Sequence, residues 1–147
     1  MKTLSELLTI VIPVYNEESN LSLCLDTIKD MQNILVIDSG STDGTVAVAN
    51  KYHCKVVEFK WNGKFPKKRN WALRNCQFNT PWVLFLDADE RVTPGVKQEL
   101  LKVLNSTEHN CFRLIYDNWF MGKMLKHGDS MCKTAILRIG FGEYEKI

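Results

Sequence analysis

The sequence predicts an α/β fold in which helices sandwich a mostly parallel sheet. Short apolar runs rich in β-branched residues, typical of buried parallel strands, alternate with segments whose apolar residues recur at helical spacing. Three of these runs end in polar residues, at 15–17, 38–41 and 87–89. Ligands bind outside the carboxyl ends of the strands in such sheets, so the three polar ends predict one site along one sheet edge.

Length and charge limit the class of protein. The chain has 147 residues, which favours one domain with a central sheet and a helix layer on each face. No apolar run approaches the roughly 20 residues that cross a bilayer. The net charge of +2 is too small to favour nucleic acid as a partner. A phosphorylated small molecule fits this composition better.

The N-terminus and the cysteines favour an intracellular protein. An acid precedes the short apolar run that ends at Pro13, which indicates a first strand rather than a signal peptide. The five cysteines are odd in number, far apart and without a C-x-x-C pair, so neither a disulfide framework nor a zinc site is expected. We interpret them as small buried side chains or bystanders in a reducing cytoplasm.

The first half of the chain predicts two strand–helix units. Residues 8–14 form a buried strand broken at Pro13, and Ser19 or Asn20 caps the helix that follows. One apolar stripe marks the buried face of this helix, and it consists of Leu21, Cys24, Leu25 and Ile28. The second strand, 34–37, stops at Asp38, and the Gly- and Ser-rich loop after it lets backbone N–H groups approach a ligand closely.

A helix over 45–52 and a strand over 55–59 lead to a basic helix that opens with Lys67, Lys68 and Arg69. Taken alone, such a run is more simply a solvated helix face. Its position just before the acidic strand end favours a ligand role instead. The guanidinium fork of Arg69 can pair with diphosphate oxygens opposite a metal.

The central strand, 82–86, runs directly into Asp87 and Asp89. If the chain stays extended, the two carboxylates project to the same side, and two hard oxygen ligands suit Mg²⁺ or Mn²⁺. For this D-x-D pattern alone, a polar turn that caps the next helix remains an alternative. That helix starts at Thr93 and Pro94 and runs through Leu104.

The last part of the chain has a weaker pattern. Residues 111–116 alternate as a strand, and 134–139 predict a final strand. Between them, residues 117–129 mix aromatic, basic and glycine residues without a period. We interpret them as an irregular segment that covers the site.

Four stretches together, 10–18, 36–45, 69–73 and 86–90, resemble in order and spacing the nucleotide-sugar half of a family 2 glycosyltransferase of the GT-A fold. The finer resemblance is to the branch that contains lipopolysaccharide core glucosyltransferases. The resemblance implies a GT-A-like, Rossmann-like single domain. Residues 1–110 would bind the nucleotide sugar, and 111–147 would form a short acceptor part.

The resemblance also implies which residues bind the donor: Pro13, Tyr15, Glu17, Asp38, Arg69, Asp87, Ala88 and Asp89. The first three would line the base and ribose, and Asp38 would hydrogen-bond the uracil. Arg69 would approach the diphosphate, and Asp87 the ribose or sugar. Asp89 would bind Mg²⁺ or Mn²⁺ directly.

The implied reaction is metal-dependent, inverting transfer from a UDP-type nucleotide sugar to a glycan or lipopolysaccharide-type acceptor. The metal would stabilise the leaving diphosphate, and a separate carboxylate would serve as base. In the related branch an aromatic-Pro-Asp stretch follows a His-Gly pair. Here His127 and Gly128 are followed by Asp129 without that stretch. Asp129 is the candidate base, and an ordinary loop aspartate is the alternative.

Other interpretations stay open. The family usually continues with acceptor-binding or membrane-associating segments, so the chain is a minimal enzyme, a truncated and catalytically idle nucleotide-sugar-binding module, or one part of a longer system. Association with the inner face of the membrane would come through the acceptor. The strand end also resembles haloacid-dehalogenase-type phosphatases, but Arg91 stands where that family wants Thr or Val. Neither G-x-G-x-x-G nor the phosphate loop G-x-x-x-x-G-K-[ST] is present.

Overall fold

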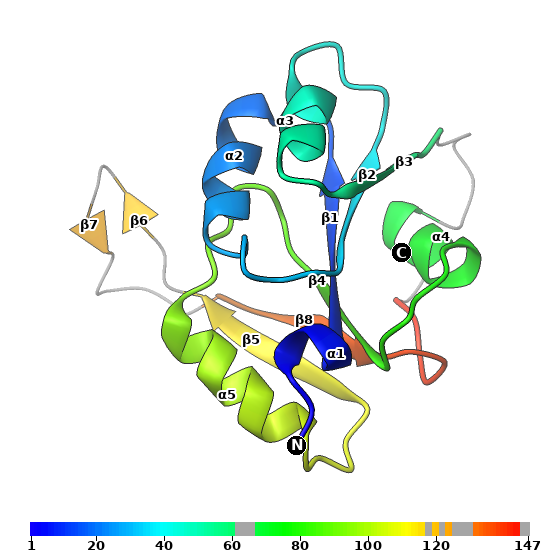
Figure 1. Ribbon diagram of the computed structural model, residues 1–147, viewed down its shortest axis with the longest axis vertical. Coiled ribbons are helices and arrows are strands. Elements are labelled where there is room, and N and C mark those ends of the chain that lie inside the picture. Colours follow the sequence, from blue (N-terminus) through cyan, green and yellow to red (C-terminus); the bar gives the residue numbers. More distant parts are fainter. Residues whose placement is uncertain (61–66, 117–118, 121–122, 125–130, 145–147) are drawn as a thin grey trace.

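A computed structural model describes residues 1–60, 67–116, 119–120, 123–124 and 131–144 (Figure 1). Six strands form one sheet in the order β3-β2-β1-β4-β8-β5. Their bounds are β1 (Leu8–Val14), β2 (Ile34–Asp38), β3 (Lys55–Glu58), β4 (Trp82–Phe85), β5 (Cys111–Tyr116) and β8 (Met131–Arg138). β1, β2, β3 and β4 are parallel, and β8 is antiparallel to both β4 and β5. The predicted α/β class with a mostly parallel sheet is confirmed.

Helices cover both faces of this sheet (Figure 1). Their bounds are α1 (Leu4–Leu7), α2 (Glu18–Asp26), α3 (Thr45–Lys51), α4 (Lys68–Asn75) and α5 (Pro94–Leu104). α1, α2, α3 and α5 pack on one face, and α4 packs on the other. None of the helices in the described ranges is long and apolar enough to cross a membrane.

β1 shows why the central strands of the sheet, β1, β2 and β4, are mostly apolar on both faces. Ile10 and Ile12 belong to the core cluster under α2 and α5, whereas Val11 belongs to the cluster under α4. Successive side chains of a strand point to opposite faces, and here each face is covered by helix. Both sets are therefore buried.

The N-terminal boundaries differ from the prediction in three places. α2 begins at Glu18, before the predicted caps Ser19 and Asn20, and ends at Asp26. The four residues of the predicted stripe are fully buried, although the last of them, Ile28, lies just beyond the helix. α1 was not expected, and it is held by a capping box between Thr3 and Glu6. Pro13 lies inside β1 instead of breaking it, because β4 pairs only with residues 8–11 and Pro13 faces β2 alone.

The four cysteines whose side chains the structure describes are free thiols with different exposure. Cys24 and Cys54 are buried, and burial raises their thiol pKa values to about 12 and about 11. Cys111 is exposed on β5, at the edge of the sheet. The side chain of Cys132 lies outside the part that the structure describes.

The segment after β5 was predicted to be irregular. It contains a short antiparallel pair, β6 (Trp119–Phe120) and β7 (Lys123–Met124), so that prediction is wrong for these residues. β8 starts at Met131 rather than at the predicted Thr134, because it pairs with the whole length of β5. That residues 117–129 cover the site stays a prediction.

Candidate functional site

The carboxyl ends of β1, β2, β3 and β4 lie along one edge of the sheet, because these strands are parallel neighbours. This arrangement brings together the three polar strand ends at 15–17, 38–41 and 87–89, as predicted. β8 runs in the opposite direction, so its first residues reach the same edge. Lys133 thereby joins the site from the far end of the chain.

The loops after β1 and β2 are bonded to each other. The side-chain oxygen of Asn16 accepts a hydrogen bond from the backbone N–H of Thr42 at 2.8 Å, and the Asn16 N–H donates to Ser41 Oγ at 2.9 Å. The Glu17 N–H donates to Thr45 Oγ1 at 2.9 Å. Asn16 has a φ of +50°, a left-handed conformation that asparagine adopts more readily than most residues. The two loops therefore form one wall of the site.

The residues expected at the base and ribose sit on this wall. Tyr15 is 57% exposed, so its ring is accessible for stacking on a ligand. Pro13 and Glu17 are partly buried, and Glu17 Oε2 accepts a hydrogen bond from Asn20 Nδ2 at 3.1 Å. Gly44 admits the neighbouring Glu18 carboxylate, since a Cβ there would lie 2.3 Å from Glu18 Oε1.

Asp38 is only 5% exposed and shapes the second loop. Its Oδ2 accepts hydrogen bonds from the N–H groups of Gly40 at 3.1 Å and Ser41 at 3.0 Å, and Ser41 Oγ donates to Oδ1. Gly40 has a φ of +84°, which the turn requires. The predicted contact of Asp38 with uracil stays a prediction beside this loop-forming role.

Lys68 was not singled out from the sequence, yet it reaches the wall. Its Nζ donates a hydrogen bond to the carbonyl oxygen of Val14 at 2.7 Å. Burial lowers the pKa of Lys68 to about 8, although the Asp38 carboxylate acts in the opposite direction. The basic run at 67–69 predicted positive charge in this region. Which lysine points towards the sheet depends on how α4 is rotated about its axis, and the run does not show this.

The lowered pKa of Lys68 makes the free energy of unfolding depend on pH. Its pKa falls from about 10.5 to about 8 on folding, so the unfolded chain holds more protons between these values. The free energy of unfolding contributed by this group therefore rises as pH increases from about 8 to about 10.5. We expect Lys68→Met to flatten this rise in urea titrations across that range. Lys29→Met, at an exposed lysine, should keep the wild-type slope, and an unchanged slope in Lys68→Met would contradict the prediction.

The D-x-D stretch departs from its predicted geometry. The N–H of Glu90 donates to the carbonyl oxygen of Asp87 at 2.9 Å, so the chain turns directly after the strand. The premise that Asp87 and Asp89 extend from one strand is therefore wrong. Asp87 is partly buried, Ala88 is buried in the core, and Asp89 is exposed. The turn gives the two carboxylates different surroundings.

Asp87 is an ionic anchor. One carboxylate oxygen accepts from Arg69 Nη2 at 2.9 Å, and the other accepts from Lys133 Nζ at 2.7 Å. Burial works against ionisation, but the Lys133 hydrogen bond and the Arg69 charge hold the pKa of Asp87 below its ordinary value. Lys133 also lies 3.2 Å from Glu90 Oε2. Sequence reasoning missed Lys133, because the last strand was expected to begin one residue after it.

Tyr116 ends β5 beside this anchor. The Lys133 ammonium lies 5.0 Å from the centre of the Tyr116 ring. The phenol oxygen is buried and has no hydrogen bond within the described part of the chain. Burial and the negative charge of Glu90 raise the pKa of Tyr116. This phenol is thus un-ionised at neutral pH.

Asp89 differs from Asp87 in having no hydrogen bond or ion pair to any residue that the structure describes. Within the same ranges, no group of three His, Cys, Asp or Glu side chains is arranged to hold a metal. Mg²⁺ is commonly bound through one or two carboxylates together with substrate phosphates, rather than by an all-protein cage. An exposed, unbonded carboxylate fits a cation that binds together with a diphosphate.

Asp129 and His127 lie outside the described residues.

Comparison with known proteins gives a family match. The family model described as "Glycosyl transferase family 2" matches residues 9–143. The chain is 31% identical over 98 residues to the lipopolysaccharide core biosynthesis glycosyltransferase LpsC of Rhizobium meliloti, which covers 63% of this chain and 35% of that protein. It is 33% identical over 110 residues to an uncharacterized glycosyltransferase of Rickettsia conorii, with 74% and 37% covered.

Among solved structures, the mannosyltransferase PcManGT of Pyrobaculum calidifontis, in complex with GDP-Man and Mn²⁺, is 25% identical. The match has a TM-score of 0.49 and covers 66% of this chain and 31% of that one. The chain spans about a third of the length of the curated relatives named above.

Proposed function

Because the chain belongs to glycosyl transferase family 2, we propose that it binds a UDP-type nucleotide sugar and transfers the sugar to a glycan or lipopolysaccharide-type acceptor. The observation that carries this proposal is the meeting of three polar strand ends at one sheet edge, with Arg69 and Lys68 supplying positive charge there. Such an edge suits an anionic ligand that also carries a polar base and sugar.

In this proposal the wall formed by the first two loops receives the nucleoside. Pro13, Tyr15 and Glu17 line the base and ribose, with the exposed Tyr15 ring as a stacking surface. Asp38, whose carboxylate shapes the second loop, hydrogen-bonds the uracil. The buried Ala88 supports the strand end rather than presenting a polar group.

Arg69 and Asp89 serve the diphosphate in this proposal. Arg69 stays paired with Asp87 and offers its remaining N–H donors to phosphate oxygens. Asp87 contacts the ribose or the sugar. Asp89 would hold Mg²⁺ or Mn²⁺, and the bound cation would neutralise negative charge on the departing nucleoside diphosphate. Lys68 adds positive charge at the end of β1, where its Nζ is bonded to the Val14 carbonyl oxygen.

The proposed chemistry is a single displacement with inversion. An acceptor hydroxyl attacks the anomeric carbon, the bond to the diphosphate breaks, and a carboxylate takes the hydroxyl proton. Asp129 is the proposed base, because it is the nearest acid after the His-Gly pair. The similarity to a lipopolysaccharide core biosynthesis glycosyltransferase supports the acceptor class.

Calorimetry and a transfer assay test the proposal on the wild-type chain. UDP with Mn²⁺ should give a binding heat larger than UDP in EDTA, and UDP-sugars should raise the thermal midpoint. Absence of heat with UDP and Mn²⁺ would show the proposal to be wrong. Binding without hydrolysis or transfer to any glycan extract would instead identify an idle nucleotide-sugar-binding module.

Asp129→Asn should abolish transfer and keep UDP binding, and intact turnover in this variant would remove Asp129 as the base.

A further inference from the structure

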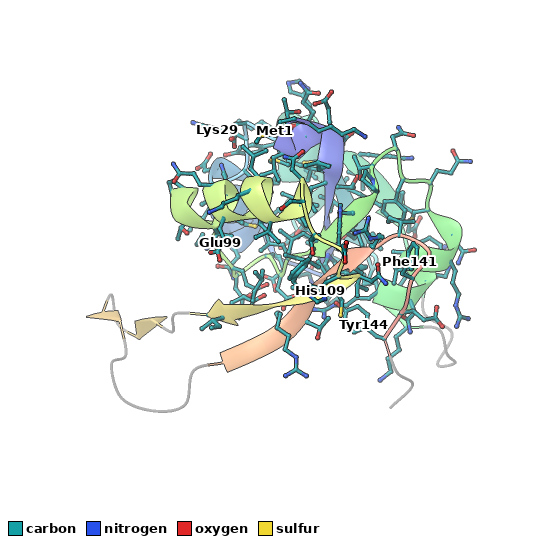
Figure 2. All side chains as sticks on the ribbon, turned by 90° about the horizontal axis from the view of Figure 1, so that it is seen from below. Met1, Lys29, Glu99, His109, Phe141 and Tyr144 are labelled. Carbon is teal, nitrogen blue, oxygen red and sulfur yellow. The ribbon has the colours of Figure 1, made fainter. Side chains whose placement is uncertain are left out.

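We propose that Tyr144 is a positioning residue that holds Arg69 in place for the nucleotide diphosphate. This inference rests on the proposed function and adds a part of the chain that no motif marks. After β8, the chain turns back and packs against α4, the helix that carries Arg69 (Figure 1). Figure 2 labels Phe141 and Tyr144 in this returning segment.

The returning segment is attached to α4 by a buried amide. Asn70, the residue after Arg69, is 3% exposed. Its Nδ2 donates to the carbonyl oxygen of Tyr144 at 2.6 Å, and its Oδ1 accepts from the Tyr144 N–H at 2.7 Å. One turn along the helix, the Arg74 guanidinium donates two hydrogen bonds to the Glu143 carboxylate. The backbone of Tyr144 is thereby held against the start of α4.

The Tyr144 side chain is held at its far end as well. Its hydroxyl donates to the carbonyl oxygen of Thr134 in β8 at 2.9 Å. Its ring meets the Phe85 ring edge-on, with centroids 5.6 Å apart and an interplanar angle of 75°. Tyr144 thus connects α4, β4 and β8, and its ring has little freedom to move.

This fixed ring is one side of a seat for the Arg69 guanidinium. Arg69 Cζ lies 5.4 Å from the centre of the Tyr144 ring and 5.9 Å from that of Phe85, while Nη2 is bonded to Asp87. Aromatic faces attract a guanidinium and restrain its plane. Arginine has five N–H donors, and Asp87 accepts the one hydrogen bond that Arg69 makes to described residues. The seat holds the fork in one orientation with donors left for phosphate oxygens.

We expect Tyr144 to affect binding because it orders the Arg69 side chain before a ligand binds. A mobile arginine loses side-chain entropy when it binds a ligand, and this loss is a cost to the binding free energy. Tyr144 removes part of this cost before the ligand arrives. Its contribution should therefore appear only when Arg69 is present to be ordered.

A double-mutant cycle measured by calorimetry with UDP and Mn²⁺ tests this inference. We expect Tyr144→Leu to weaken UDP binding about threefold to tenfold. Tyr144→Phe keeps the ring and should recover most of that affinity. In an Arg69→Ala background, Tyr144→Leu should have almost no further effect, because the residue that it positions is gone. Phe141→Leu is the matched control, since Phe141 is an exposed aromatic residue of the same segment.

The outcomes separate this inference from the proposed function. If the wild-type chain binds no UDP, the proposed function is wrong and the inference fails with it. If the wild type binds UDP and Tyr144→Leu binds equally well, the inference alone is wrong. A loss of the same size with and without Arg69 would assign Tyr144 a purely structural role and would also overturn it.

Discussion

Replacing Asp89 with alanine will remove the part of UDP affinity that depends on a divalent cation. In Mn²⁺ we expect affinity to fall at least about tenfold, to the value that the wild type shows in EDTA, because loss of a direct ligand costs no less than loss of a residue that only supports one. Sugar transfer should fall on the order of a hundredfold or more, since negative charge on the leaving group would go unstabilised. Calorimetry in Mn²⁺ and in EDTA measures the first effect, and product formation measures the second.

The surroundings of Asp89 make this a clean experiment. Its carboxylate has no hydrogen bond or ion pair with the described residues, so Asp89→Ala should leave the free energy of unfolding within about 0.5 kcal/mol of the wild type. Glu99→Ala is the control, because Glu99 is an exposed acid on α5 (Figure 2). An Asp89→Ala variant that keeps its full response to Mn²⁺ would show that the cation is held elsewhere.

The sheet could be predicted closely because its strands carry a strong local signal. The buried strands β1 and β2 are apolar except for Thr9 and the terminal Asp38, and the run that becomes β4 is equally clear. α5 was bounded correctly by Thr93, whose side chain accepts from the Val96 N–H, and by Pro94 in the first turn. The order of the strands, in contrast, depends on long-range pairing. β8 enters between β4 and β5, and no local pattern indicates this insertion.

The site was less predictable because its geometry depends on a turn and on distant partners. The D-x-D spacing is compatible with an extended chain or with a turn, and only the Glu90 N–H bond to Asp87 shows which one forms. Lys133 lies 46 residues from Asp87 in sequence. Tyr144 lies 74 residues from Asn70. Local propensity carries no information about such pairs, so the motifs located the sheet edge without revealing which partners neutralise Asp87.

Replacing Asp87 with alanine will destabilise the fold, whereas Asp89→Ala will not. Asp87→Ala leaves Arg69 without its carboxylate and leaves Lys133 with Glu90 alone. Removing one partner of a fully buried ion pair costs about 3–5 kcal/mol, and the Asp87 side chain is 38% exposed, so solvent screening reduces the expected loss to about 1–2 kcal/mol. Urea unfolding of the two variants beside the wild type measures this difference. Equal stabilities for Asp87→Ala and Asp89→Ala would contradict the distinction between the two aspartates.

The pH dependence of that loss identifies its cause. The folded-state pKa of Asp87 is lowered, so its stabilisation is fully present above the ordinary carboxyl pKa near 4 and is lost as pH falls through the lower folded value. The stability gap between wild type and Asp87→Ala should therefore be constant near neutral pH and close in acid. Lys133→Met in the Asp87→Ala background should recover part of the loss, because it removes one of the two cations that the missing carboxylate had neutralised. A gap that persists in acid would mean that Asp87 stabilises the fold through packing, and its two ion pairs would then contribute little.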